Sequence, residues 1–341
     1  GNKYSLQHLK DLGYKTFHPF IDETYDNCPT WERLPAIIKA ISDIAQKTPE
    51  EKLEWFKNLE EISLEIKDLL EKKRQELELR FIEEKHIYFM KDVDGQVKSN
   101  FPSVSKIIKK FHKPFDADGM ALKMSNGDPE GARLLQEQWR QAGELSTNMG
   151  SRVHFELETD LIGRYDNYKD VRQPIYQIDE EQKAKSDNMI YAGKRFLDVM
   201  HDRGAVLLDT EIVLGDPFLQ YTGQPDKAWL MMNKQKTDFG FVITDWKTNQ
   251  PKNFQVHSYT GKMYHPFQDI HDNALGHYYL QLPLSARLLK QLLQGPKYED
   301  KNFLGGVIVL LKDDGTHVEY KVPQKIKDTI MTMDLSKYIK R

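Results

Sequence analysis

Two apolar runs separated by a polar break mark the centre of the chain, in the stretch YTGQPDKAWLMMNKQKTDFGFVITDWKT at residues 221–248. The first run covers 221–231 and the second covers 239–244, with polar residues at 233–238 between them. Short runs that are rich in aromatic and branched side chains are typical of strands, and the polar break is typical of a turn. We therefore expect two paired strands of a buried sheet here.

Helix-like and strand-like patterns alternate on both sides of this stretch. Apolar residues recur at helical spacing over 31–44, and Thr48-Pro49-Glu50-Glu51 predicts the start of a helix that continues to about Glu84. Further helices are expected from Gly150, over 189–201 and over about 278–293, and strands or hairpins over 86–98, 205–214 and 303–322. This order predicts an α/β fold with a mostly helical N-terminal region, residues 1–85, and a second domain, residues 86–341.

The composition narrows the function classes. A net charge of −3 and a pI near 6.5 exclude a globally basic, DNA-coating protein, so any nucleic acid must meet a local patch. The single Cys28 excludes internal disulfides and a four-cysteine iron–sulfur cluster. The sequence has no phosphate-binding GxxxxGK[ST] loop, so we expect no built-in ATPase or helicase motor. Without a signal peptide or an apolar run of about 18 residues, we expect no membrane partner and a cytoplasmic protein. A bacterial or phage-infected cell fits best, or an organelle if the source is eukaryotic.

Two aspartates stand at positions that suit a core poorly. Asp226 follows Gly-Gln-Pro, and Asp245 follows the apolar run FVIT, with Lys247 two residues beyond it. Two residues apart on a strand, Asp245 and Lys247 point to the same face. Carboxylate oxygens bind hard divalent cations, and an ammonium can orient a water or offset charge on a phosphate. The alternative is an ordinary salt bridge at a strand end.

These residues, Pro225-Asp226 and Asp245-Trp246-Lys247, resemble the signature of the PD-(D/E)XK nucleases, and within them the RecB-like exonucleases. The Asp-x-Lys spacing alone carries little, because 30% of the residues are charged and Glu65-Ile66-Lys67 matches it by chance. Two further elements add to it: FPSVSK at 101–106 and Gly150-x-x-x-His154 resemble phage exonucleases and the mitochondrial genome maintenance exonuclease. The resemblance covers about residues 87–322 and implies a restriction-endonuclease-like core, a mixed sheet flanked by helices.

The resemblance also implies a set of site residues. It gives Asp226 and Asp245 as ligands of Mg²⁺ or Mn²⁺, assisted by His154 and the Trp246 carbonyl, and Lys247 as the residue that orients the attacking water. It further implies that Gln281, in a Gln-x-x-x-Tyr element, lies near the metal, although Ser285 occupies the tyrosine position.

Two acids stay open between a supporting and an incidental role. Glu158 lies four residues after His154, hence on the same helix face, and either supports the metal site or forms a helix salt bridge. Glu211 lies inside the apolar run 205–214 and is either a supporting acid behind the ligands or a strand-edge residue.

A separate set of residues is predicted to contact DNA. Ser103 is a plausible N-cap whose neighbouring amides can receive a phosphate. Basic side chains follow it on one helix face and either contact the DNA backbone or are simply solvated: Lys106, Lys109, Lys110 and Lys113. Arg152 reaches either a phosphate or solvent.

The expected function is a metal-dependent deoxyribonuclease, an exonuclease that acts on DNA ends and favours single-stranded DNA. The same residues would serve a structure-specific endonuclease on branched or flapped DNA, because substrate geometry decides between the two. A third possibility is a non-catalytic module that binds DNA ends within a larger complex. Its partners would be DNA and proteins of replication, recombination or repair.

Overall fold

The computed structural model describes residues 49–82, 85, 87–99, 101–165, 176–234, 237–251, 254, 261–295 and 297–339. The helix predicted over 31–44 lies outside these residues. The chain divides into two compact units, Gly1–Lys57 and Asn58–Arg341, and all described elements except the start of the first helix belong to the second. Residues 58–85, assigned above to the N-terminal region, are in that second unit, and the domain boundary at 85/86 stays a prediction.

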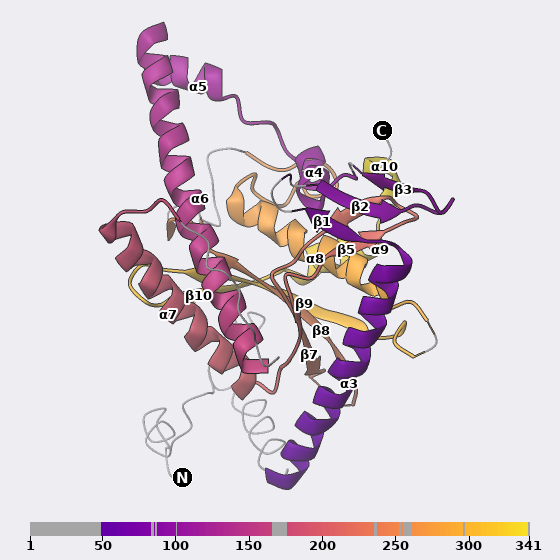
Figure 1. The fold of residues 1–341 in the computed structure, drawn as a ribbon. Helices are drawn as coiled ribbons and strands as arrows, with labels where there is room; N and C mark the ends of the chain where they lie inside the picture. The colour runs from indigo at the N-terminus through magenta and orange to yellow at the C-terminus, as the bar shows by residue number, and fades with distance from the viewer. Residues whose placement is uncertain are drawn as a thin grey trace, which may run out of the picture. The chain divides into compact units, whose positions relative to one another are not determined.

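A five-stranded mixed sheet forms the centre of the second unit (Figure 1). Its strand order is β10–β9–β8–β7–β4, with bounds β4 Val206–Thr210, β7 Lys227–Met232, β8 Phe239–Lys247, β9 Asn302–Leu311 and β10 His317–Lys321. Neighbouring strands are antiparallel except β8 and β9, which are parallel. The second central strand, expected over 239–244, is confirmed by β8. The first, expected over 221–231, is divided into β6 (Tyr221–Gly223) and β7, which belong to different sheets. The fold is α/β with a mixed sheet flanked by helices.

Helices cover the sheet according to the alternation of β8. Val242 and Trp246 join an apolar core with Leu157 of α6 (Pro129–Tyr165) and Phe196 of α7 (Glu180–Asp202). These two helices lie along each other (Figure 1). Asp245, of the opposite parity, points to the other face, where α8 (Ala274–Leu292) packs against β8 and β9. The sheet is thus the middle layer between two helical layers.

The helix predicted from Thr48 to Glu84 is shorter than expected. Helix α3 spans Pro49–Glu76 and is followed by β1 (Arg80–Ile82), which begins a small antiparallel sheet with β2 (Ile87–Lys91) and β3 (Val97–Ser99). The helix prediction for 77–82 was therefore wrong, because the strand pairing of 80–82 with β2 overrides the local helical pattern. Residues 83 and 84 lie outside the described part. The hairpin expected over 86–98 is confirmed by β2 and β3.

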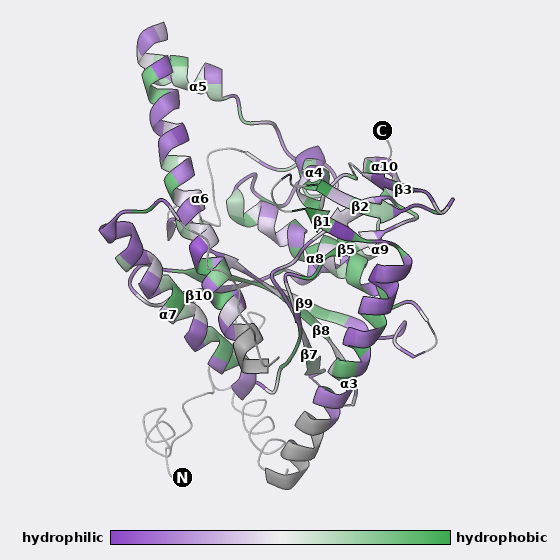
Figure 2. Cartoon of the chain, in the orientation of Figure 1, coloured by the Kyte–Doolittle hydropathy of each residue, from purple (hydrophilic) through white to green (hydrophobic). Residues whose placement is uncertain are grey.

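Helix α3 packs by one stripe of apolar side chains rather than standing free. Leu59, Ile66 and Leu70 are buried, whereas several charged residues of the described part are exposed: Glu60, Glu61, Glu65, Asp68, Glu71 and Lys72. Figure 2 shows this alternation of hydrophilic and hydrophobic residues along α3, α6 and α7. No helix of the described part is long and apolar enough to span a membrane.

Shorter elements complete the fold. α4 (Val104–Ile108), the 3₁₀ turn η4 (Lys109–Phe111) and α5 (Ala117–Met124) precede α6, and β5 (Leu214–Asp216) pairs with β6 (Tyr221–Gly223). The chain continues after β10 with α9 (Gln324–Thr332) and α10 (Ser336–Ile339). The first core strand, expected over 205–214, is split at 211–213 into β4 and β5, which belong to different sheets.

Candidate functional site

The ends of β7 and β8 bring the two predicted aspartates together. The antiparallel register pairs Lys227 with Thr244, so one further step along each strand brings Asp226 opposite Asp245. Both aspartates are buried, with exposed fractions of 6% and 1%. Two neighbouring carboxylates in a buried place repel each other unless cations or hydrogen bonds compensate them.

Asp226 is held by its neighbours on three sides. Its Oδ2 accepts a 2.6 Å hydrogen bond from the backbone N–H of Trp246 and lies 3.4 Å from Nδ1 of His154. Burial alone would raise the pKa of Asp226, but the charges of His154, Lys227 and Lys247 outweigh it and hold this pKa well below its usual range. The carboxylate is therefore ionised and available as an oxygen ligand.

A glycine on α6 explains how His154 reaches this carboxylate. Gly150 does not begin a helix, as expected above, but lies in the interior of α6. A Cβ added at Gly150 would lie 3.1 Å from the Thr248 hydroxyl, tighter than ordinary contact. The missing side chain thus lets α6 approach the end of β8, and one turn later His154 faces Asp226. The sequence pairing of Gly150 with His154 is explained by this close approach.

Glu211 reaches the same place from the turn after β4. Its backbone is left-handed, with φ 47°, a conformation that costs a non-glycine residue of the order of 1 kcal/mol. Ligand-type atoms of His154, Glu211 and Asp226 all lie within 4.8 Å of one another, so these three side chains form a group able to hold a metal ion. Glu211, expected as a supporting or incidental acid, thus stands among the candidate ligands.

Burial and the neighbouring acids change the protonation of Glu211. Its pKa is raised well above the usual range by desolvation, and the negative charge of Asp226 adds to this effect. A carboxyl group of this kind releases a proton when a cation binds it.

Asp245 is engaged differently from Asp226. Its Oδ2 forms an ion pair with Lys247, and its Oδ1 accepts a 3.1 Å hydrogen bond from the Gln281 amide on α8. Burial and the charge of Asp226 raise the pKa of Asp245, although Lys247 opposes this rise. Among the described residues Asp245 does not belong to the three-residue group, so its predicted ligand role stays a prediction.

Lys247 is fixed from two directions. Besides the pair with Asp245, its Nζ lies 4.3 Å from the centre of the Tyr278 ring, a cation–π contact supplied by α8. Burial opposes the charged form, but Asp245 and Asp226 outweigh it and raise the pKa of Lys247, so the ammonium stays charged. Tyr278 was not among the predicted site residues, although it stands three positions before Gln281.

Lys227 is a site residue that the sequence reasoning missed. It is fully buried, and its Nζ has no hydrogen-bond partner within the part of the chain that the structure describes. The ammonium lies 4.3 Å from the centre of the Trp246 ring. Burial lowers the pKa of Lys227, while the charges of Asp226 and Glu211 oppose this shift. A lysine between an aspartate and the apolar run AWLMM was a visible signal, because lysine is rarely fully buried without a partner.

Three further predicted residues have contacts that bear on their expected roles. Trp246 donates its backbone N–H to Asp226, and the ligand role of its carbonyl stays a prediction. Arg152 forms an ion pair with Asp187 of α7 and a hydrogen bond to Ser186, so its guanidinium joins two helices. Glu158 acts on the site through its charge, which raises the pKa of Glu211.

The segment with the predicted DNA contacts lies beside the loop that carries Asp226. Ser103 caps α4, as predicted, accepting from the Lys106 N–H at 3.4 Å, and it forms an isolated bridge with Thr222. A Cβ on Gly223 would meet Val104 at 2.8 Å, so α4 and this strand end are in close contact. Glycine is required here for packing, three residues before Asp226.

The basic side chains on this segment are free for an external partner. Lys106, Lys109 and Lys110 are exposed, and no described acidic side chain forms an ion pair with them. Such lysines are free to meet a polyanion without breaking an existing contact.

No protein-family model and no curated protein sequence matches the chain. The site geometry and its chemistry therefore carry the proposal that follows.

Proposed function

We propose that the chain is a metal-dependent deoxyribonuclease of the PD-(D/E)XK type, with a restriction-endonuclease-like core, that acts on DNA ends. The observation that carries the proposal is the convergence of His154, Glu211 and Asp226 beside the Asp245–Lys247 pair. These side chains come from separate elements and meet at one sheet end, which supports a site built for chemistry rather than for packing.

The three converging side chains fit a divalent cation. Two carboxylates and one imidazole suit Mg²⁺ or Mn²⁺, and the imidazole favours Mn²⁺ relative to an all-oxygen site. Such a cation polarises a phosphodiester and neutralises charge in the transition state. The left-handed backbone at Glu211 is consistent with a ligand role, because strain of this kind is kept where function requires it.

The remaining residues position the reacting groups. Lys247, held charged by Asp245 and by the Tyr278 ring, offers an N–H to a water or a phosphate oxygen. Gln281 fixes the orientation of Asp245 through its hydrogen bond, so the lysine and the aspartate keep one geometry. Asp226, anchored by the Trp246 N–H, keeps one carboxylate orientation towards the cation.

The substrate class follows from the exposed lysines beside this site. Lys106, Lys109 and Lys110 offer positive charge, which fits recognition of the phosphate backbone rather than of particular bases. Arg152 is not part of this proposal, because α7 already holds its guanidinium.

End-labelled linear DNA and closed circles, single- and double-stranded, test the proposal when incubated with Mg²⁺, Mn²⁺ or a chelator. Release of mononucleotides or short products from linear DNA only, dependent on the cation, is the expected result. Cleavage of circles would support the endonuclease alternative, and binding of ends without cleavage would support the non-catalytic module. If the chain neither bound nor cleaved any of these DNA substrates, the proposal would be overturned.

A matched pair of buried aspartates assigns the activity to the site. Asp226→Asn should lower the rate at least a hundredfold and weaken cation binding, because a neutral amide is a poor ligand for Mg²⁺. Asp216→Asn is the control: Asp216 is equally buried, with an exposed fraction of 5%, but accepts only the backbone N–H groups of Phe218 and Leu219. Similar rates in the two variants would remove Asp226 from the site.

A further inference from the structure

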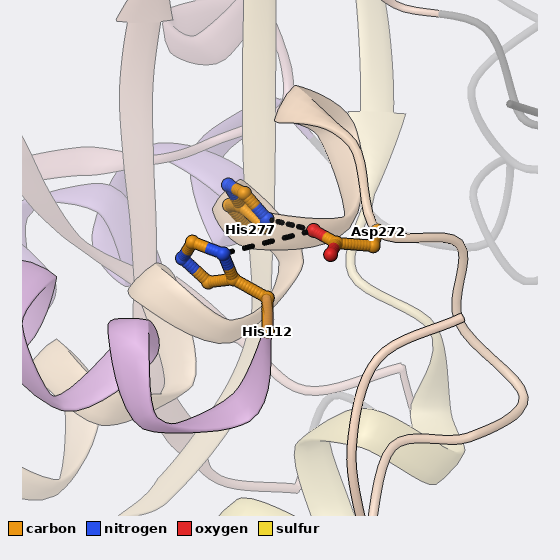
Figure 3. A group of neighbouring side chains, drawn as sticks. All are labelled: His112, Asp272 and His277. Carbon is orange, nitrogen blue, oxygen red and sulfur yellow. Dashed lines mark hydrogen bonds and ion pairs between the residues drawn. The ribbon is translucent and has the colours of Figure 1, made fainter. Parts of the chain in front are cut away.

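A second group of metal-ligand side chains lies outside the candidate nuclease site. His112, Asp272 and His277 bring ligand-type atoms within 4.8 Å of one another (Figure 3). His112 follows η4. Asp272 stands just before Asn273, the N-cap of α8, and His277 belongs to the first turn of this helix. The group therefore joins two segments that are about 160 residues apart in the sequence.

Both imidazoles address the same carboxylate oxygen. Oδ1 of Asp272 lies 2.7 Å from Nε2 of His277 and 3.8 Å from Nδ1 of His112. In Figure 3 the two rings lie face to face with these nitrogens turned towards Asp272, and their centres are 4.1 Å apart with an angle of 25° between the planes. Ligands at about 2.0–2.1 Å from a tetrahedral zinc ion are about 3.3 Å apart, between the two measured separations.

The Lys113 N–H also donates to Oδ2 of Asp272, at 3.3 Å, so a hydrogen bond already joins the two segments. The His277–Asp272 contact has hydrogen-bond length, but the His112–Asp272 separation of 3.8 Å is too long for a hydrogen bond. Nδ1 of His112 lies 3.0 Å from the Lys113 carbonyl oxygen, which it meets as a donor when no ion is present. With a cation, the proton would move to Nε2 of the ring, and the carbonyl is a fourth donor atom beside the group.

We propose that His112, Asp272 and His277 form a second cation site, for a transition-metal ion of the zinc class, that fastens η4 to the start of α8. Two imidazoles and a single carboxylate favour Zn²⁺ or Co²⁺ over Mg²⁺, which requires mostly oxygen ligands. The partial burial of all three side chains limits competition from water.

The place of this group in the fold gives the ion a structural consequence. His277 and Gln281 are one helical turn apart on α8, so they share a helix face. An ion at His277 would hold the start of α8 against the segment that carries the exposed lysines. The site is thus expected to add stability to the folded chain, by an amount that grows with the free ion concentration.

Cobalt binding tests the site directly. The full chain, freed of metals with a chelator and dialysed, is titrated with Co²⁺ while the visible absorption of tetrahedral cobalt is recorded, and Zn²⁺ is then added as competitor. We expect an intense visible band that Zn²⁺ abolishes, and a thermal midpoint that rises with Zn²⁺. His112→Asn and His277→Gln should each weaken Co²⁺ binding at least tenfold and remove the Zn²⁺-dependent rise.

Two controls separate this site from other causes. His154→Ala, in the first group, should keep the cobalt band, and His201→Asn removes an exposed histidine of α7 without touching either group. Circular dichroism in the presence of chelator establishes that each variant is folded, and His112→Asn remains informative if the more buried His277→Gln is not. Full cobalt binding by a folded His112→Asn variant, or no band in the wild-type chain, would overturn the proposal.

Discussion

Opposite charges at the end of β8 compensate one another residue by residue. Asp245 pairs with Lys247, and Asp226 pairs with His154, while Lys227 lies buried beside the Trp246 ring without a hydrogen-bond partner among the described residues. A buried ion pair contributes little net stability, because desolvation of both groups offsets their attraction. The charges are therefore better explained by a task at the site than by a need for stability.

Lys247 and Lys301 offer a matched test of this view. Each lysine pairs with an aspartate, at Asp245 within β8 or at Asp238 just before it, and each side chain is 15% exposed. Lys247→Ala should lower the cleavage rate at least a hundredfold, because the donor to the reacting phosphate is lost. Lys301→Ala should leave the rate within about twofold, and its loss of stability serves as the reference. Rates would be measured at saturating DNA; equal rates for both variants would exclude a catalytic role for Lys247.

Variants of Glu211 and Glu158 distinguish a residue that binds the cation from one that only lies near it. Glu211→Gln should weaken Mg²⁺ or Mn²⁺ binding at least tenfold, because it removes one of three converging ligands, whereas Glu158→Gln should change it only a few-fold. The raised pKa of Glu211 also predicts how the cation affinity depends on pH. Because the proton of Glu211 must leave before the cation binds, the affinity rises with pH until this group is ionised. Calorimetric titrations from about pH 5 to about pH 8 should show proton release in the wild-type chain and a flatter profile in Glu211→Gln. Identical profiles would return Glu211 to a supporting role.

The site residues could be predicted from the sequence where the pattern of a regular strand places them, and not where the position depends on an irregular part of the backbone. Asp226, Asp245 and Lys247 could be predicted because strand alternation and register place them at one sheet end. Glu211 was predicted only as a supporting or strand-edge acid. Its place among the candidate ligands was not predicted, because it depends on a left-handed residue at the point where the expected strand is split. Gly150 was predicted to begin a helix, because glycine is uncommon in helix interiors. In the structure it lies inside α6, where the missing side chain permits the close approach of α6 to the end of β8.

The contact between α7 and β10 allows a test at this scale. Both terminal nitrogens of Arg203 donate to Glu319 at 2.8 Å, and His317 lies beside the same carboxylate. Burial would raise the pKa of Glu319, but the neighbouring His317 and the hydrogen-bonded Arg203 outweigh it and lower this pKa to about 2.

A depressed folded-state pKa means that this contact contributes stability above the unfolded carboxyl pKa and loses it as pH falls towards about 2. The free energy of unfolding of Glu319→Gln should therefore lie about 2–3 kcal/mol below that of the wild-type chain near pH 7. The difference should shrink as pH falls below about 4.5. Urea unfolding at a series of pH values measures it. A constant difference at all pH values would show that packing, not the charge of Glu319, causes the loss.

At the scale of the whole second unit, the exposed lysines and the candidate site belong to one neighbourhood. α4 packs against α8 and contacts β6, which ends three residues before Asp226. Lys106 lies on this helix, and Lys109 and Lys110 follow it in η4. Helix α3 buries Ile66 and Leu70 against the rest of the unit. Recognition of DNA is thus better sought on the α4–η4 segment than on α3.

Replacing Lys106, Lys109 and Lys110 by alanine together tests this placement. Three fewer phosphate contacts should weaken binding of linear single-stranded DNA and reduce the slope of log affinity against log salt by about 2, with an unchanged rate at saturating DNA. A variant with alanine at Lys72, Lys123 and Lys321 carries the same change in net charge on α3, α5 and β10 and should keep both quantities. If the backbone enters by an end along these lysines, closed single-stranded circles should bind both wild-type and control chains but resist cleavage. Efficient cutting of circles, or equal salt slopes for the two triple variants, would refute end-directed entry along α4 and favour an endonuclease that meets DNA on another face.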